Sequence, residues 1–151
     1  MRRAIMLVAV GSLFLTLLAA EAAVAATYTC NDSRCDGTDR RDVITGDGSD
    51  QAFRLYDGND VGRGKRGHDL LFGDWDSDVL YGNRGADVLS DRGDRGDYDE
   101  LVGGRGNDVL RVNDGDERDF GDCGRGDDTL WVDSEYEAGN FSNCEEVIID
   151  W

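Results

Sequence analysis

The chain has 151 residues, a formal net charge of −17 at pH 7 and no proline, and 26 of its 33 acidic residues are aspartates. A chain this acidic repels nucleic acid and anionic membrane surfaces, so neither is an expected partner. It should also stay disordered unless something neutralises its carboxylates, and an oxygen-rich surface of this kind suits a hard cation.

The N-terminal segment predicts a secretory signal peptide over residues 1–25. Two arginines precede an apolar run from Ile5 to Ala20, and the small residues that follow, up to Ala26, form a cleavage site. An uncleaved membrane anchor is the alternative, but the run is short for a span. Cleavage after Ala25 would leave 126 residues without a further apolar stretch of spanning length, so we expect a secreted protein without membrane insertion.

Residues 26–36 are expected to form an N-terminal cap that precedes the rest of the fold. The chain has four cysteines, and an even number in an exported chain indicates two disulfides. Proximity in sequence favours pairing Cys30 with Cys35 and Cys123 with Cys144, although the other connectivities stay open at this point. These two bridges would lie at the two ends of the fold.

Residues 37–131 form a tandem repeat whose register is marked by one aspartate per unit. Five of the nine intervals between successive anchors are nine residues long, the anchors being Asp42, Asp50, Asp60, Asp69, Asp78, Asp87, Asp99, Asp108, Asp119 and Asp128. Each unit has a glycine-rich turn before the aspartate and an aliphatic residue two positions after it, such as Leu80 or Leu110. Because glycine permits left-handed backbone, each unit predicts a turn followed by a short strand.

A strand of about three residues cannot bury its single leucine alone, so successive units must stack. If alternate strands lie on opposite sides, two units make one coil and the leucines meet between two thin parallel sheets. Ten anchors predict an all-β solenoid of about five coils, roughly 24 Å long at about 4.8 Å per rung. Gly62 and Gly121 occupy aliphatic positions, where Val61 and Phe120 are expected to compensate.

The units resemble the RTX, or haemolysin-type, calcium-binding nonapeptide repeat G-G-x-G-x-D-x-U-x, in which U is a large aliphatic residue. Gly103–Arg111 matches every fixed position, and Gly64–Phe72 and Gly82–Ser90 miss only the second glycine. The resemblance implies a parallel β-roll with calcium between turns stacked on the same edge. Insertions around 92–98 and 113–118 interrupt the array, so we expect the least regular sites beside them.

The resemblance also implies the calcium ligands, which are shared between a unit and the one two places on. The carboxylates would come from Asp60, Asp69, Asp78, Asp87, Asp99, Asp108 and Asp128. The turn carbonyls would come from near Gly64, Gly67, Gly82, Gly85, Gly103 and Gly106. Asp60 would face Asp78, Asp69 would face Asp87, and Asp108 would face Asp128 or Asp87.

Stacked aspartates repel one another without an intervening cation, so we expect folding and calcium binding to be one equilibrium. Magnesium fits less well because it keeps its waters and demands octahedral geometry. Zinc would lack its usual ligands, because the chain has one histidine and its cysteines are expected to be oxidised. An affinity of about 10⁻⁴–10⁻³ M, typical of extracellular modules, is expected.

Residues 132–151 follow the repeats and are expected to form a C-terminal cap, with Val147–Ile149 as a final strand. Catalysis is not expected, because His68 occupies a variable repeat position and neither G-x-S-x-G nor H-E-x-x-H occurs. The alternatives to plain calcium binding are a cell-surface adhesion module and, less favoured, a secreted hydrolase. Adhesion is suggested by Arg-Gly-Asp strings at 92–94, 95–97 and 125–127, which turns of this composition also produce by chance.

Overall fold

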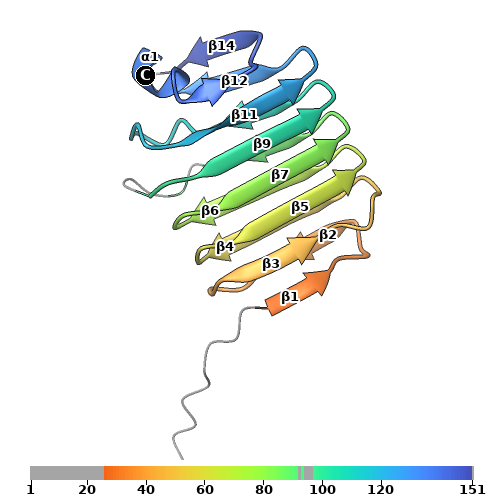
Figure 1. Cartoon of the computed structure of the whole chain (residues 1–151). Coiled ribbons are helices and arrows are strands. Elements are labelled where there is room, and N and C mark those ends of the chain that lie inside the picture. Colours follow the sequence, from red (N-terminus) through yellow and green to blue (C-terminus); the bar gives the residue numbers. More distant parts are fainter. Residues whose placement is uncertain (1–25, 92, 94–96, 151) are drawn as a thin grey trace, which may run out of the picture.

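The structure is a computed structural model that describes residues 26–91, 93 and 97–150, so the predicted signal peptide lies outside the described residues. The described chain forms a parallel β-solenoid of about seven turns with almost no helix (Figure 1), which confirms the predicted β-roll. The expected number of five coils was too small because the segments that flank the repeats add rungs at both ends. The described residues contain no helix long and apolar enough to cross a membrane.

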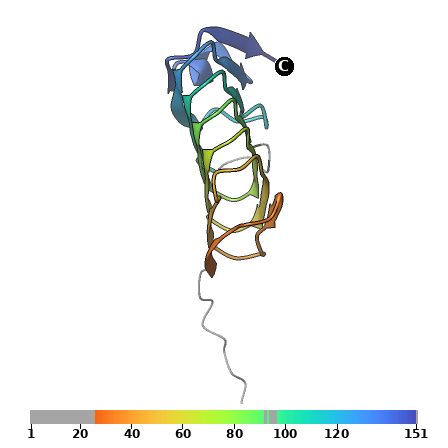
Figure 2. The same cartoon turned by 90° about the vertical axis from the view of Figure 1, so that its right-hand side faces the viewer.

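Two seven-stranded parallel sheets face each other as thin layers, and each strand pairs with the strand two places away (Figure 2). Sheet A contains β1 (Ala26–Thr29), β3 (Asp42–Thr45), β5 (Val61–Arg66), β7 (Val79–Arg84), β9 (Glu100–Arg105), β11 (Phe120–Arg125) and β13 (Phe141–Ser142). Sheet B contains β2 (Arg34–Asp36), β4 (Ala52–Asp57), β6 (Leu70–Trp75), β8 (Val88–Ser90), β10 (Val109–Arg111), β12 (Thr129–Val132) and β14 (Glu146–Ile149). The helix α1 (Glu135–Ala138) lies between β12 and β13.

The core is a file of inward-pointing side chains on each sheet, to which Leu55, Val112 and Val132 add a second apolar residue in their coils. The repeat leucines are fully buried and lie in register, as Leu71, Leu89, Leu110 and Leu130 do in sheet B. The expected compensation at the two aliphatic-position glycines was wrong, because Phe120 is 43% exposed and Val61 is only partly buried. Leucines from neighbouring strands fill the room beside Gly62 instead, and Phe141 lies beside Gly121.

Both ends of the solenoid carry a disulfide, with the predicted pairing. Cys30 is bonded to Cys35 and Cys123 to Cys144, with Cα–Cα distances of 5.8 and 5.2 Å. At the other end of the chain from β1, β14 pairs with β12 along its whole length, which confirms the expected final strand over Val147–Ile149.

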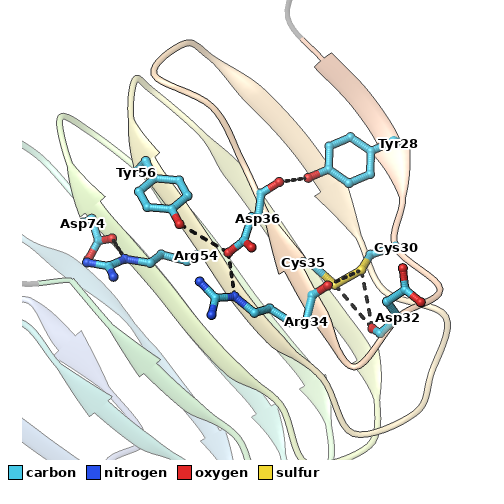
Figure 3. A network of polar contacts seen from close by, with 9 residues as sticks. All are labelled: Tyr28, Cys30, Asp32, Arg34, Cys35, Asp36, Arg54, Tyr56 and Asp74. Carbon is cyan, nitrogen blue, oxygen red and sulfur yellow. Dashed lines mark hydrogen bonds and ion pairs between the residues drawn. A yellow bond between two sulfur atoms is a disulfide. The ribbon is translucent and has the colours of Figure 1, made fainter.

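Polar contacts tie the first coils together at the N-terminal end (Figure 3). The Arg34 guanidinium pairs with the Asp36 carboxylate at 2.9 Å, and the Tyr56 hydroxyl donates to the same carboxylate at 3.4 Å. The Tyr28 hydroxyl donates to the Asp36 carbonyl, which joins β1 of sheet A to β2 of sheet B. These contacts cover the first rungs with polar groups that the repeat motif does not supply.

Candidate metal centre

The anchor residues form two columns, one along each edge of the solenoid. We call edge A the turns that precede strands of sheet A, which carry Asp42, Asp60, Asp78, Asp99 and Asp119. Edge B consists of the turns that precede the strands of sheet B. These turns carry Gln51, Asp69, Asp87, Asp108 and Asp128. Every aspartate of both columns is at most 1% exposed, including all seven that the sequence predicts as ligands.

One anchor was assigned to the wrong residue. Asp50 is exposed, whereas Gln51 is 3% exposed and takes the anchor position on edge B. The Gln51 N–H donates to Asp69 Oδ1 at 2.9 Å, the same bond that the aspartates make further along. With Gln51 in place of Asp50, the first intervals become nine residues each, and only the two insertions interrupt the period.

One carboxylate oxygen of each anchor joins a ladder of hydrogen bonds along the edge. On edge A, the N–H groups of Asp60, Asp78 and Asp99 donate to Oδ1 of the next anchor at 2.7, 2.8 and 2.9 Å. On edge B, those of Asp69, Asp87 and Asp108 do the same at 2.8, 2.8 and 2.7 Å. The predicted neighbours are thus adjacent, and Asp108 contacts both Asp87 and Asp128.

The second carboxylate oxygen is buried and has no hydrogen-bond partner among the described residues. This holds for Oδ2 of Asp60, Asp69, Asp78, Asp87, Asp108, Asp119 and Asp128. A buried carboxylate oxygen without a partner is costly, and a repeated column of them needs a common explanation. A bound cation would explain this column, because it would contact the carboxylate oxygens that do not take part in the backbone ladder.

The turn glycines of edge B leave room for such a cation. A Cβ added to Gly82 would lie 2.5 Å from Asp87 Oδ2 and 2.7 Å from the carbonyl oxygen of Gly103 in the next coil. A Cβ on Gly103 would similarly meet Asp108 Oδ2 at 2.6 Å, and one on Gly64 would collide with Asp69 Oδ2. Glycine therefore keeps open a pocket in which a carboxylate oxygen and a backbone carbonyl converge, the ligand types that calcium prefers.

The other three predicted glycines follow Gly64, Gly82 and Gly103 within the same turns. Gly67, Gly85 and Gly106 have φ angles of 106°, 138° and 131°, in the left-handed region that favours glycine. A Cβ on Gly85 would collide with the Gly67 carbonyl oxygen, and one on Gly106 with that of Gly85. The turns thus stack with carbonyl oxygens directed at the neighbouring coil.

Burial makes the anchors reluctant to ionise without a metal. It raises the pKa of Asp60 to about 7, of Asp78 to about 8 and of Asp99 to about 9, and neighbouring aspartates add to each shift. On edge B, burial raises the pKa of Asp69 and of Asp108 to about 6, and the charge of Asp87 contributes to both. A cation bound at the Oδ2 atoms would favour the ionised carboxylates and so act against these increases in pKa.

The first anchor of edge A differs from the others. Asp42 Oδ2 accepts hydrogen bonds from the Thr38 N–H at 2.6 Å and from its hydroxyl at 2.9 Å. The Oδ2 atom of this anchor therefore accepts hydrogen bonds from uncharged protein groups, unlike Oδ2 of Asp60 and Asp78 in the following coils.

Beside the predicted ligand Asp99, the insertions bring together carboxylates that the sequence did not identify as ligands, among them Asp97, Asp119 and Glu137. Oxygens of Asp97, Asp99 and Asp119 lie within 4.8 Å of one another, as do those of Asp116, Asp119 and Glu137. Asp119 had the correct spacing and could have been included, whereas Asp97 lies outside the nonapeptide period. Glu137 is fully buried on α1, and burial raises its pKa to about 8.

The chain matches the family model described as RTX calcium-binding nonapeptide repeat, in four copies over residues 56–89 and 93–122. RTX nonapeptide repeats bind Ca²⁺, and the repeat is a structural rather than a catalytic element. No curated protein and no solved structure matches the chain.

Proposed function

The repeats over residues 56–122 belong to the RTX calcium-binding nonapeptide repeat family, and from that premise we propose that this protein is an extracellular calcium binder that folds with its metal. The observation that carries the proposal is the column of buried Oδ2 atoms without hydrogen-bond partners among the described residues. Each lies beside the backbone ladder that the matching Oδ1 atoms complete, so each of these Oδ2 atoms is left to contact a cation.

We assign the carboxylate ligands to the anchors predicted from sequence, which are Asp60, Asp69, Asp78, Asp87, Asp99, Asp108 and Asp128. Carbonyl oxygens at or beside Gly64, Gly67, Gly82, Gly85, Gly103 and Gly106 would complete the coordination. Edge B supports this assignment most directly, because glycine pockets adjoin Asp69, Asp87 and Asp108. Calcium accepts six to eight oxygen ligands at about 2.3–2.6 Å, a number that two stacked turns can supply.

Coupling of folding to binding follows from the same geometry. The apolar core is thin, with one or two residues per coil on each sheet, while the two edges bring aspartates of successive coils together. Without metal, these carboxylates either repel one another or must take up protons. Calcium removes that cost only in the folded state, so its binding free energy becomes folding free energy.

An extracellular location is supported by the two disulfides and by the leader-like N-terminus. Millimolar calcium outside cells would saturate sites with dissociation constants of about 10⁻⁴ M, whereas the low calcium inside would leave the chain unfolded for export. The two disulfides would then hold the ends of a fold whose middle depends on the metal.

Far-UV circular dichroism and calorimetry during calcium addition test the proposal on the chain from Ala26 onwards. We expect β signal to appear together with heat of binding in calcium, and magnesium at the same concentration to give much less of both. An equally compact, β-rich protein in excess chelator and in millimolar calcium would refute the coupling. Absence of calcium-binding heat would refute the metal sites.

Adhesion is a second candidate because one Arg-Gly-Asp string lies on an exposed turn. Arg125, Gly126 and Asp127 are all exposed, next to the buried anchor Asp128. A receptor that reads this string would lose binding when Asp127 is replaced by glutamate, because the longer side chain displaces the carboxylate. Equal retention of wild type and Asp127→Glu on cell surfaces, in calcium, would remove this candidate.

A further inference from the structure

The first insertion places an aspartate where the repeat has a turn glycine. β6 and β8 pair with Phe72 opposite Ser90, so the next residues, Gly73 and Asp91, are neighbours in adjacent coils of edge A. The Asp91 N–H continues the sheet pattern by donating to the Arg111 carbonyl oxygen at 2.8 Å. Asp91 is therefore the counterpart, on this edge, of Gly103 beside Gly82 on edge B.

The Asp91 carboxylate is buried and points into the pocket beside Gly73. The residue is 1% exposed, and neither of its carboxylate oxygens has a hydrogen-bond partner within the described part of the chain. A Cβ added to Gly73 would collide with both Asp91 Oδ2 and Asp78 Oδ2. At Gly82 the corresponding point is shared by Asp87 Oδ2 and the Gly103 carbonyl oxygen, so here a carboxylate takes the place of a backbone carbonyl.

Further carboxylates lie near enough to this pair for their charges to act on Asp91. Burial raises the pKa of Asp91 well above its ordinary value, and the charges of Asp99, Asp78, Asp119 and Asp97 raise it further. Oxygens of three of these four, Asp97, Asp99 and Asp119, approach one another within 4.8 Å. Asp78 Oδ2 and Asp119 Oδ2 are also buried with no hydrogen-bond partner among the described residues. The insertion thus concentrates acidic side chains where the other turns offer mainly carbonyls.

We propose that Asp78, Asp91, Asp97, Asp99 and Asp119 form a carboxylate-rich calcium site that fills before the repeat-type sites. The inference rests on the calcium binding proposed above and adds a site with a different ligand set. Calcium affinity rises with the number of charged ligands and with the rigidity of the site. Five carboxylates from three adjacent coils supply more charge than two stacked repeat turns, so the first ion would fix the middle of the solenoid.

Calorimetric calcium titration of the wild-type chain and of Asp91→Gly tests the proposal. Glycine is the residue at the equivalent place in the neighbouring turn, Gly73, and in the turns of edge B that begin with Gly64, Gly82 and Gly103, so this change converts the insertion site towards the repeat type. We expect a tight class of binding in the wild type that Asp91→Gly loses, with at least about tenfold weaker affinity, the lower limit typical of losing a supporting group at a metal site. Asp87→Asn, at a repeat turn of edge B, should keep the tight class.

Terbium luminescence gives a second measurement at the same place. Trp75 and Tyr98 are exposed aromatic residues in two of the turns that form the site, each 58% exposed, and both can sensitise a bound lanthanide. We expect the first equivalent of terbium to give strong sensitised emission in the wild type and in Asp87→Asn, and calcium to displace it. Emission that first appears with later equivalents would contradict the proposed order of filling.

The outcomes separate this inference from the general proposal. If the wild type binds no calcium, both fail. If it binds calcium but Asp91→Gly retains the tight class, the repeat sites stand and the insertion site is overturned. If Asp91→Gly does not fold in calcium, the near-isosteric Asp91→Asn is judged by the same criterion, and retention of the tight class again overturns the site.

Discussion

Replacing Asp87 by asparagine should change stability in opposite directions with and without calcium. Asparagine keeps an oxygen that can accept the Asp69 N–H, now bonded to Asp87 Oδ1 at 2.8 Å, so the backbone ladder can survive. It removes the charge and replaces Oδ2, which is buried without a hydrogen-bond partner in the described chain. The substitution therefore acts on the metal position while it leaves the fold's hydrogen bonds in place.

The magnitude follows from the spacing of the coils. Asp87 lies between Asp69 and Asp108. Burial, together with the charge of Asp87, raises the pKa of each to about 6, so both are largely ionised at pH 7.5. Two unit charges one rung apart, about 4.8 Å, repel by about 3 kcal/mol at an effective dielectric constant of about 20. Asp87 has two such neighbours, so without metal the loss of its charge should stabilise the folded form by about 3 kcal/mol or more.

With metal, the same change removes a ligand. A site saturated at about 100 times its dissociation constant stabilises the fold by about 2.7 kcal/mol, and the variant would lose that contribution at the site that Asp87 serves. The gain in chelator and the loss in calcium are thus each on the order of a few kcal/mol and opposite in sign. A purely structural role for Asp87 would lower stability in both conditions.

The assay needs one titration in each condition. In chelator, folding is induced with trimethylamine N-oxide and followed by far-UV circular dichroism, and the midpoint should move to lower osmolyte for Asp87→Asn. In 10 mM calcium, unfolding by urea should occur at lower denaturant than in the wild type. Asp50→Asn, the same change at an exposed position of the same edge, is the control. Destabilisation in both conditions would refute the electrostatic argument.

Three further predictions follow from the same geometry. Gly82→Ala should eliminate one calcium site by calorimetry, because its Cβ would lie 2.5 Å from Asp87 Oδ2; unchanged stoichiometry would contradict the glycine pocket. The metal-free chain should be more folded at pH 5 than at pH 9, because the pKa values of Asp60, Asp78 and Asp99 are raised to about 7, 8 and 9 in the folded form, so stability is lost as pH rises through that range. Circular dichroism in chelator across pH measures this, and β signal that grows with pH would have the wrong sign. Replacing both Cys123 and Cys144 by serine should cost about 3 kcal/mol in urea unfolding in calcium, against about 2 kcal/mol for the pair Cys30 and Cys35, because the closed loops span 21 and 5 residues. An equal or reversed order would show that loop entropy does not set these costs.

The fold could be predicted from the sequence because one period governs it. The nine-residue spacing, the leucine two places after each aspartate and the glycine-rich turns all require stacked short strands, and the structure has them. The anchor at Gln51 could not be recognised from the repeat, because the motif has a carboxylate at that position and this turn has an amide. The Gln51 amide oxygen accepts the Asp47 N–H at 3.0 Å and would collide with a Cβ on Gly46, so an amide takes the place of the carboxylate in this turn.

The flanking coils could not be predicted from the motif, because their strands need no repeat signature. β1 and β2 at one end, and β13 and β14 at the other, join the sheets through backbone hydrogen bonds, which any sequence with compatible side chains can make. Side-chain hydrogen bonds particular to these segments hold the C-terminal end in place. The Asn140 side chain donates to the Asp119 carbonyl oxygen at 3.1 Å, and the Asp128 N–H donates to Glu145 at 2.9 Å.

The difference between the two edges was present in the sequence but could not be interpreted before the coils were known. Alternate units lie on opposite edges, and on edge B the turns that precede Gln51, Asp69, Asp87 and Asp108 all begin with glycine. On edge A the equivalent positions include Leu55, Val112 and Val132, which are fully buried, and Asp91. At these positions an apolar side chain fills the space that glycine would leave for a cation and adds to the core. Asp91 instead directs a carboxylate into that space. We therefore expect repeat-type calcium sites chiefly along edge B, and on edge A a single strong site where the insertion supplies its own acidic ligands.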